Sequence, residues 1–354
     1  MRGWIKVIHL NEAVIPHYQS EMVPTEKLKT MVALNEAYLR EKPTWYMING
    51  SLQYFKVRND FRLFTEQFFS IFGREIMDLD TVDYSVAYVK NTSRFAPPSE
   101  KGYKCGLLSR NFQEIGYNYF LVSELMKPEI SSLVSYGDYS FQNLLQFFKD
   151  SLTSENYEQI KTFLIKLFIS DGFTHEQDRN YHNIAFRVPR IEGISYRRRL
   201  HSSVLSQLKN CPKHFDITSD GRILIKDLTP TKVYDNEKIF GTDHRNVFNY
   251  SPGQIWRPLF PFSSDTLFQS AEEADRVSNT DFDGLDPNLC SLYFEYPEIC
   301  KPFFDRLANG DEYRRILERF HGSASQINLT EDAVEHVARI CEDKRQAFQK
   351  ILKI

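Results

Sequence analysis

A short polar stretch of this chain carries residue types that phosphoryl transfer requires. The stretch DRNYHNIAF contains Asp178 and Asn183 at the spacing D-x-x-x-x-N, which protein-kinase catalytic loops use. Asp235 stands further along in LTPTKVYDNEKIFG, after an apolar strand and a Thr-Pro turn. Because phosphoryl transfer depends on positioning and charge neutralisation, it needs an aspartate near the acceptor hydroxyl and oxygen ligands for Mg²⁺. We therefore predict Asp178 as the catalytic base and Asn183 and Asp235 as metal ligands.

The same residues also fit a simpler interpretation. Asp and Asn are common in turns, so Asp178 and Asn183 could belong to a polar loop and Asp235 to an Asx-turn. The flanking sequence favours a catalytic loop, because an amphipathic helix at 156–170 precedes it and an apolar strand follows it. Arg179, beside the predicted base, is expected to hold the loop in place rather than to contact phosphate.

Upstream, Lys56 and Glu66 could supply the remaining parts of such a site. Lys56 lies between two apolar residues of a predicted strand, where a lysine either extends its ammonium group into solvent or binds phosphate. Glu66 follows ten residues later in an aromatic helix, roughly opposite a stripe of phenylalanines, so a solvated position is the alternative for it. A strand lysine paired with a glutamate of the next helix is the ion pair that kinases use. We predict that these two residues form it.

The elements around these residues change character near residues 113–128. Before that point the sequence predicts a hairpin over 43–58 with an Asn-Gly turn, an aromatic helix that stops near Gly73, and strands at 81–90 and 103–109. This order is typical of a small α+β unit. After it the sequence predicts helices at 141–152 and 156–170, a hairpin within 216–228, long loops over 241–290, and helices from 311 to 354 with Thr330 as an N-cap.

Composition narrows the classes of protein to consider. The chain has 354 residues, of which 42% are hydrophobic and 26% are charged, as in ordinary folded proteins. Its net charge of −3 gives no sign of direct nucleic-acid binding. Five scattered cysteines without C-x-x-C spacing indicate reduced thiols rather than a zinc site or a disulfide framework. No signal peptide and no apolar run of about 20 residues is visible, so we expect a cytoplasmic protein without a transmembrane segment.

Taken together, the motif stretches resemble the HipA-like Ser/Thr kinases of bacteria, in particular the small members that lack the extra amino-terminal subdomain. The resemblance covers about residues 39–245 and is most specific in the catalytic-loop and Tyr-Asp stretches. It implies that REKPTWYMINGSLQYFKV is the hairpin ending in the nucleotide lysine, Lys56, and that LFTEQFFSIFGREI carries its partner, Glu66. YKCGLLSRNF would be the strand leading to the hinge, and the backbone facing the adenine would belong to Leu108, Ser109 and Arg110.

The resemblance implies an α+β, bilobal protein-kinase-like fold. The small β-rich lobe would span residues 1–125 and the larger, mainly helical lobe residues 126–354. ATP and Mg²⁺ would be the cofactors, and the substrate would be a protein phosphorylated on Ser or Thr. HipA relatives also suggest an antitoxin or other regulatory partner, and a role as a toxin or as an effector delivered into a host cell.

The sequence departs from this family at three places. The phosphate-loop position reads LNEAYLREKP, without the glycines that let backbone amides approach phosphates closely. An insertion between Asn183 and Asp235 contains YRRRL, which could be a docking patch for the substrate. Residues 246–300 match no part of the family pattern.

Two other functions stay open. A lipid kinase of the phosphoinositide type also uses an Asp-Arg-x-x-x-Asn loop, but it places Asp-Phe-Gly shortly afterwards, whereas Asp235 follows Asp178 by 57 residues. A pseudokinase scaffold would fit the glycine-free phosphate loop, although the retained polar residues argue against it. The kinase interpretation is the leading one.

Overall fold

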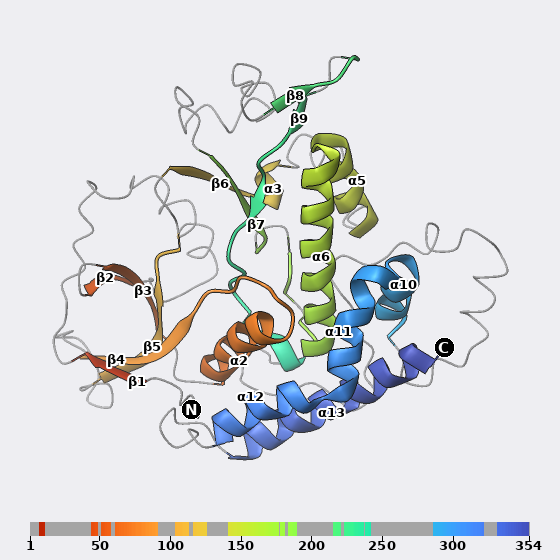
Figure 1. Ribbon diagram of the computed structural model, residues 1–354. Coiled ribbons are helices and arrows are strands. Elements are labelled where there is room, and N and C mark those ends of the chain that lie inside the picture. The colour runs from red at the N-terminus through yellow and green to blue at the C-terminus, as the bar shows by residue number, and fades with distance from the viewer. Residues whose placement is uncertain are drawn as a thin grey trace.

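The fold combines helices with small, mostly antiparallel sheets, as expected for the α+β class (Figure 1). The computed structural model describes residues 7–10, 44–48, 51–57, 61–90, 103–112, 116–125, 141–176, 178–180, 183–189, 215–220, 223–236, 238–241, 286–321 and 331–353.

A five-stranded sheet carries the amino-terminal part of the described chain. Its order is β1-β4-β5-β3-β2, and only the β1–β4 pair is parallel among these neighbours. β2 and β3 pair antiparallel from Thr44↔Phe55 to Ile48↔Ser51, which confirms the predicted hairpin; its two turn residues lie outside the described ranges. The strands are β1 (Val7–Leu10), β2 (Thr44–Ile48), β3 (Ser51–Val57), β4 (Tyr84–Lys90) and β5 (Tyr103–Arg110).

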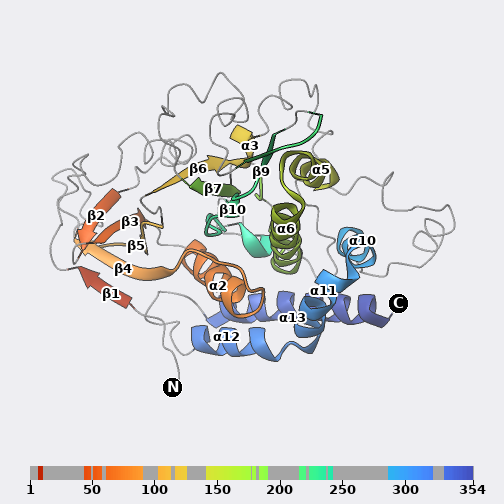
Figure 2. The same ribbon diagram turned by 45° about the horizontal axis from the view of Figure 1, so that its top comes forward.

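Helix α2 (Arg62–Glu75) is the predicted aromatic helix, but it continues past the stop expected at Gly73. Gly73 is needed for packing rather than for termination, because a Cβ atom there would lie 2.5 Å from Thr81 Cγ2. Figure 2 shows α2 between the five-stranded sheet and α6, with α12 and α13 beneath it. The helix is therefore surrounded on most of its circumference, and ten of its residues are buried.

A second sheet lies beyond the first and has the order β10-β7-β6. It consists of β6 (Tyr117–Leu121), β7 (Ala185–Pro189) and β10 (Thr229–Pro230), and the short helix α3 (Val122–Leu125) follows β6. Because β6 pairs with β7 and not with the first sheet, the chain passes from one sheet to the other before β6, ahead of the boundary predicted at residue 125.

The helices expected after residue 125 are present. They are α5 (Phe141–Ser151) and α6 (Ser154–Thr174), and α6 ends where His175 adopts a left-handed conformation with φ 55°. The predicted hairpin within 216–228 is formed by β8 (Phe215–Ile217) and β9 (Ile223–Ile225). A 3₁₀ turn, η5 (Ile239–Gly241), follows the segment that carries Asp235, the predicted metal ligand.

Four helices make up the described carboxyl-terminal part, two more than the sequence indicated. α12 (Asp311–His321) and α13 (Glu331–Lys353) were expected, although the predicted cap Thr330 lies outside the described residues. α10 (Pro287–Glu295) and α11 (Pro297–Asn309) were not. Each begins with proline, which reads as a loop signal but is well suited to the first turn of a helix, where its missing N–H costs nothing. Asp286 caps α10 by accepting from the N–H groups of Asn288 and Leu289.

One continuous cluster of buried apolar side chains joins the sheet to the carboxyl-terminal helices through α2 and α6. Phenylalanines of α2 carry much of it: Phe64 meets Phe320 of α12 at 4.6 Å between ring centroids, and Phe72 stacks on Phe173 of α6 at 5.1 Å. This core crosses the boundary predicted at residue 125, so the division into two lobes stays a prediction.

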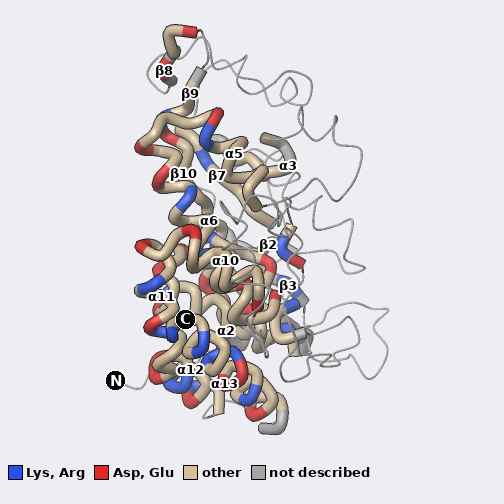
Figure 3. The backbone as a smooth tube through the Cα atoms, turned by 90° about the vertical axis from the view of Figure 1, so that its right-hand side faces the viewer, with Lys and Arg blue, Asp and Glu red and all other residues tan. Residues whose placement is uncertain are grey.

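The outer helices present charged residues of both signs along α11, α12 and α13 (Figure 3). Several form ion pairs, such as Lys301–Asp305 and Arg314–Glu342. The three cysteines described as free, Cys290, Cys300 and Cys341, are buried, in agreement with the predicted reduced thiols. Among the described helices, none combines the length and apolar character required to cross a bilayer.

Because α2 approaches Thr81 closely at Gly73, we predict that a side chain at this position destabilises the protein. Alanine is the better helix former by about 1 kcal/mol, yet its Cβ would collide with the buried Thr81 methyl, and overpacking costs about 1–3 kcal/mol. Gly73→Ala should therefore destabilise the protein in urea unfolding. Thr81→Ser removes the methyl and keeps the 2.7 Å hydroxyl bond to Ser70 O, so it should rescue Gly73→Ala. Equal losses with and without Thr81→Ser would contradict this explanation.

Candidate active site

The Lys56 ammonium group is held between two carboxylates from distant parts of the chain. Its Nζ lies 2.8 Å from Glu66 Oε1 and 2.9 Å from Asp235 Oδ1. The predicted Lys56–Glu66 ion pair is thus present, and Asp235 joins it. Lys56 is 7% exposed and Glu66 is fully buried, so neither extends into solvent. One cation against two carboxylates leaves this cluster with a net charge of −1.

The position of Glu66 follows from the packing of α2. The sequence allowed a solvated face for this residue, but neighbouring elements cover that face as well as the phenylalanine face. The second carboxylate oxygen, Oε2, accepts from the backbone N–H of Asn236 at 3.1 Å. Burial, together with the negative charge of Glu66, holds the pKa of the nearby Tyr84 hydroxyl well above its usual value. The Tyr84 hydroxyl beside this cluster is therefore held in its neutral form.

Asp235 stands in a backbone conformation that is unusual for a residue with a side chain. Its φ of 58° is left-handed, which costs about 1 kcal/mol or more and persists where the surroundings enforce it. The residues on both sides are anchored. Val233 exchanges backbone bonds with the segment at Asp80 and Val82, and the ring of Tyr234 stacks on Phe112 at 5.9 Å. These anchors turn the Asp235 carboxylate toward Lys56.

The loop after α6 places Asp178 beside a lysine that sequence reasoning did not single out. Asp178 Oδ2 lies 2.7 Å from Lys238 Nζ, and both side chains are partly exposed. The Asp178 backbone is fixed within the loop: its N–H donates to Glu176 Oε1 at 2.7 Å, and its carbonyl accepts from Asn183 Nδ2 at 2.9 Å. The sequence feature that could have pointed to Lys238 is its position in LTPTKVYDNEKIFG, three residues after Asp235.

Arg179 holds the loop in place, as predicted. Its guanidinium group forms a two-point contact with Asp171 of α6, with both N···O distances at 3.0 Å. It also donates to Tyr234 O at 3.3 Å and to Asn236 Oδ1. Because it is buried and charged, breaking these contacts would leave an uncompensated ion inside the protein. Arg179 therefore couples the Asp178 loop to the segment that carries Asp235.

The expected adenine-facing residues lie at the end of β5, the central strand of the first sheet. Leu108 pairs with Phe55 on one side and with Ser85 on the other, and Ser109 pairs on both sides in the same way. Arg110 pairs with β3 alone. A backbone paired on both sides has no free N–H or C=O to offer a ligand, so Leu108 and Ser109 cannot contact the adenine through their backbone.

Three features named from the sequence lie outside the described residues. They are the glycine-free stretch at 34–43, the YRRRL stretch at 196–200, and most of the unmatched region, 246–285.

Glu176 is a second site-adjacent residue that the sequence did not reveal. It is 2% exposed, and burial raises its pKa to about 8 although the Arg179 charge opposes this. Between pH 4.5 and about 8 the folded protein therefore holds a proton that the unfolded chain releases, and stability must fall as pH rises through this window.

This linkage predicts the effect of Glu176→Gln, which mimics the protonated acid. From pH 5 to pH 8 the unfolding free energy of the parent should fall more steeply than that of the variant, by up to about 1.4 kcal/mol per pH unit. Urea unfolding at successive pH values measures both slopes. Glu158→Gln, at an exposed position of the preceding helix α6, is the matched control. Parallel pH curves for parent and Glu176→Gln would show that Glu176 is ionised in the folded state.

Comparison with known proteins gives structural neighbours alone. No protein-family model matches the chain, and no curated protein sequence matches it. A crystal structure of the Helicobacter pylori proinflammatory kinase CtkA is similar at 12% identity and a TM-score of 0.47, over 88% of this chain and 94% of that one. HipA of Shewanella oneidensis, in complex with HipB and its operator DNA, is similar at 11% identity and a TM-score of 0.39, over 86% of this chain and 58% of HipA. These likenesses are distant.

Proposed function

We propose that this protein is a kinase that transfers the γ-phosphoryl group of ATP to a hydroxyl group of a protein substrate. The observation that carries the proposal is the buried Lys56 ammonium group, held at 2.8 Å by Glu66 and at 2.9 Å by Asp235. A strand lysine oriented by a helix glutamate is the arrangement that places a cation on nucleotide phosphates. Asp235 places a carboxylate from another segment beside the same lysine. This is the position expected for a ligand of the metal ion that binds those phosphates.

The donor set fits Mg²⁺ held partly by the nucleotide. Asn183 uses its amide nitrogen to bind the Asp178 carbonyl, and this leaves its Oδ1 oxygen as an acceptor. No group of three or more His, Cys, Asp or Glu within the described ranges could hold an ion by itself. Mg²⁺ commonly takes one or two protein oxygens and completes its shell with phosphates and water. Asp235 and Asn183 would hold it, and its charge would neutralise the phosphate oxygens.

Asp178 would act at the acceptor. It orients the hydroxyl group and takes its proton as the new oxygen–phosphorus bond forms and the bond to the leaving ADP breaks. The adenine would lie near Arg110, at the end of β5, where the pairing with β4 has stopped. Three points stay predictions from the resemblance. They are Ser or Thr as the acceptor, a regulatory partner of the antitoxin kind, and a location in the cytoplasm or in a host cell.

The roles of the two aspartates can be separated by substitution. Asp235→Ala should lose Mg²⁺-dependent ATP binding as well as turnover, and Lys56→Met should weaken ATP binding. Asp178→Ala should still bind Mg-ATP yet lose transfer by about 10²-fold or more. Calorimetric ATP titrations with and without Mg²⁺ measure binding. A phosphate-transfer assay measures turnover, and it identifies the product as protein or lipid. Normal transfer by Asp178→Ala would leave the simpler polar-loop interpretation, and absence of ATP binding by the parent would favour a scaffold.

Lys238 should act with Asp178. An ammonium group 2.7 Å from the proposed base can stabilise negative charge on the transferring phosphoryl group, and one such donor is commonly worth about 10²-fold in rate. Lys238→Met should therefore lower the transfer rate about 10²-fold with Mg-ATP affinity little changed, and Lys238→Arg should retain most of the rate. Lys232→Met, which removes an exposed ion pair with Asp80, is the control. A faster reaction in Lys238→Met would instead show that the pair restrains Asp178.

A further inference from the structure

One face of helix α2 carries polar and small residues instead of phenylalanines. Glu66, Ser70 and Gly73 stand at the spacing i, i+4 and i+7, which places them on one side of the helix. Glu66 belongs to the Lys56 cluster, whereas Ser70 takes no part in the proposed chemistry and is nevertheless buried. Buried hydroxyl groups are normally hydrogen-bonded, so the partners of Ser70 indicate what this face of α2 holds in place.

The Ser70 hydroxyl binds the segment that follows α2. Its Oγ donates to Val82 O at 2.7 Å, and the Thr81 hydroxyl donates to Ser70 O at 2.7 Å. Thr81 and Val82 are buried as well. These two reciprocal hydrogen bonds therefore fix residues 81 and 82 against α2.

Residues 81 and 82 in turn hold the segment that carries Asp235. Thr81 and Val233 form a parallel β-bridge. Its two hydrogen bonds run from Val82 N–H to Val233 O, at 2.9 Å, and from Val233 N–H to Asp80 O, at 2.8 Å. Asp235 lies two residues beyond Val233, so this bridge sets the course of the backbone that enters the site.

The same face of α2 contacts this backbone again beyond Asp235, where Glu66 Oε2 accepts from Asn236 N–H at 3.1 Å. The helix thus holds the chain on both sides of Asp235, at Val233 through the hydroxyl pair and at Asn236 through Glu66. Between them Asp235 has a φ of 58°, which a residue with a side chain keeps only where its surroundings enforce it. The two contacts with one helix supply this constraint.

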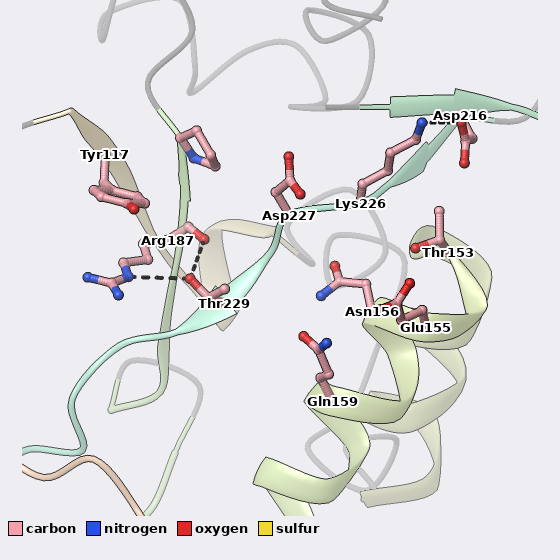
Figure 4. Close-up of a pocket in the computed structure, with 11 residues that line it drawn as sticks. Tyr117, Thr153, Glu155, Asn156, Gln159, Arg187, Asp216, Lys226, Asp227 and Thr229 are labelled. Atoms are coloured by element: carbon pink, nitrogen blue, oxygen red, sulfur yellow. Dashed lines mark hydrogen bonds and ion pairs between the residues drawn. The ribbon is translucent and has the colours of Figure 1, made fainter. Parts of the chain in front are cut away.

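The upstream end of the Asp235 segment is anchored independently of α2. Asn156 of α6 binds the Leu228 backbone at 2.7 and 3.1 Å. The Thr229 hydroxyl accepts from Arg187 of β7 at 3.3 Å, and Figure 4 shows Asn156, Arg187 and Thr229 in the wall of a polar pocket. Because α6 and β7 fix the start of the segment, loss of the Ser70 contact would displace residues 233–235 and not the whole segment.

From these contacts we infer that Ser70 and Thr81 are positioning residues for Asp235. They hold its carboxylate where it can bind a metal ion on the nucleotide phosphates, and they act through the bridge at Val233 without contacting nucleotide or metal. The metal role of Asp235 rests on the proposed kinase function, whereas its placement beside Lys56 can be tested without nucleotide.

A double-mutant cycle tests the placement of Asp235 directly. Thr81→Val removes the hydroxyl group with little change of shape, and Asp235→Asn removes the charge that attracts Lys56. Thr81→Val should raise the unfolding equilibrium constant of the parent about three- to tenfold, the usual effect of losing one hydrogen bond. In the Asp235→Asn background the increase should be at least about twofold smaller, because the Lys56–Asp235 attraction is already lost. Urea unfolding of the four proteins measures both increases.

ATP titrations in Mg²⁺ and in EDTA measure the effect on metal binding. The gain in ATP affinity that Mg²⁺ gives should fall about three- to tenfold in Thr81→Val and in Ser70→Ala, because Asp235 is displaced. ATP affinity in EDTA should stay near that of the parent, since Lys56 keeps its contact with Glu66. Thr81→Ser retains the hydroxyl group and should retain the gain.

Ser170→Ala is the matched control for Ser70→Ala. It removes another buried hydroxyl group, which donates to Lys166 O at 2.8 Å within α6. The variant should be destabilised to a similar degree, and its gain in ATP affinity from Mg²⁺ should equal that of the parent.

The outcomes distinguish the positioning roles from the kinase function. Equal costs of Thr81→Val with and without Asp235→Asn would overturn the positioning roles, and phosphate transfer by the parent would still leave the kinase function standing. An equal loss of the Mg²⁺ gain in Ser170→Ala would also overturn them. A non-additive cycle in a protein that neither binds ATP nor transfers phosphate would support the placement of Asp235 by Ser70 and Thr81 and refute the kinase function.

Discussion

The buried ammonium group of Lys56 is the constraint on which the rest of the site depends. A lysine that is 7% exposed must be compensated, and here Glu66 and Asp235 do this from two directions. Removing one partner of such a buried pair commonly costs about 3–5 kcal/mol, because a charge is then left without compensation. Strand β3, helix α2 and the segment at Asp235 are therefore held in one arrangement by a single cation. The net negative charge that remains is what a bound metal ion would compensate.

The position of Glu66 in turn depends on helices at the other end of the chain. Phe64 of α2 packs against Phe320 of α12, and Phe72 against Phe173 of α6. Outside this aromatic core, Arg319 of α12 forms two contacts with Glu75 at the end of α2, at 2.6 and 2.8 Å. The carboxyl-terminal helices thus act as the support that sets the height and rotation of α2. Their packing determines whether a glutamate on that helix can reach Lys56.

Arg179 and Asp171 join the two loops of the site below its surface. The Asp178 loop and the Asp235 segment are far apart in sequence, yet the same guanidinium group binds Tyr234 O and Asn236 Oδ1 while it is anchored to α6. Asn236 also donates its backbone N–H to Glu66. A displacement of either loop would break several buried contacts, so the two loops form one rigid unit.

The sequence by itself determined the parts of this protein that depend on neighbours in the chain. The Asn-Gly dipeptide between two β-rich runs predicted the pairing of β2 with β3, and phenylalanines at helical spacing predicted α2. The D-x-x-x-x-N spacing placed Asp178 and Asn183 in one loop, because both belong to a single short segment. Tertiary structure decided the rest: Glu66 is buried by distant helices, and Asp235 reaches Lys56 across 179 residues of sequence. Helical periodicity says which side of a helix is apolar, but burial of the opposite side depends on what the remainder of the chain packs against it.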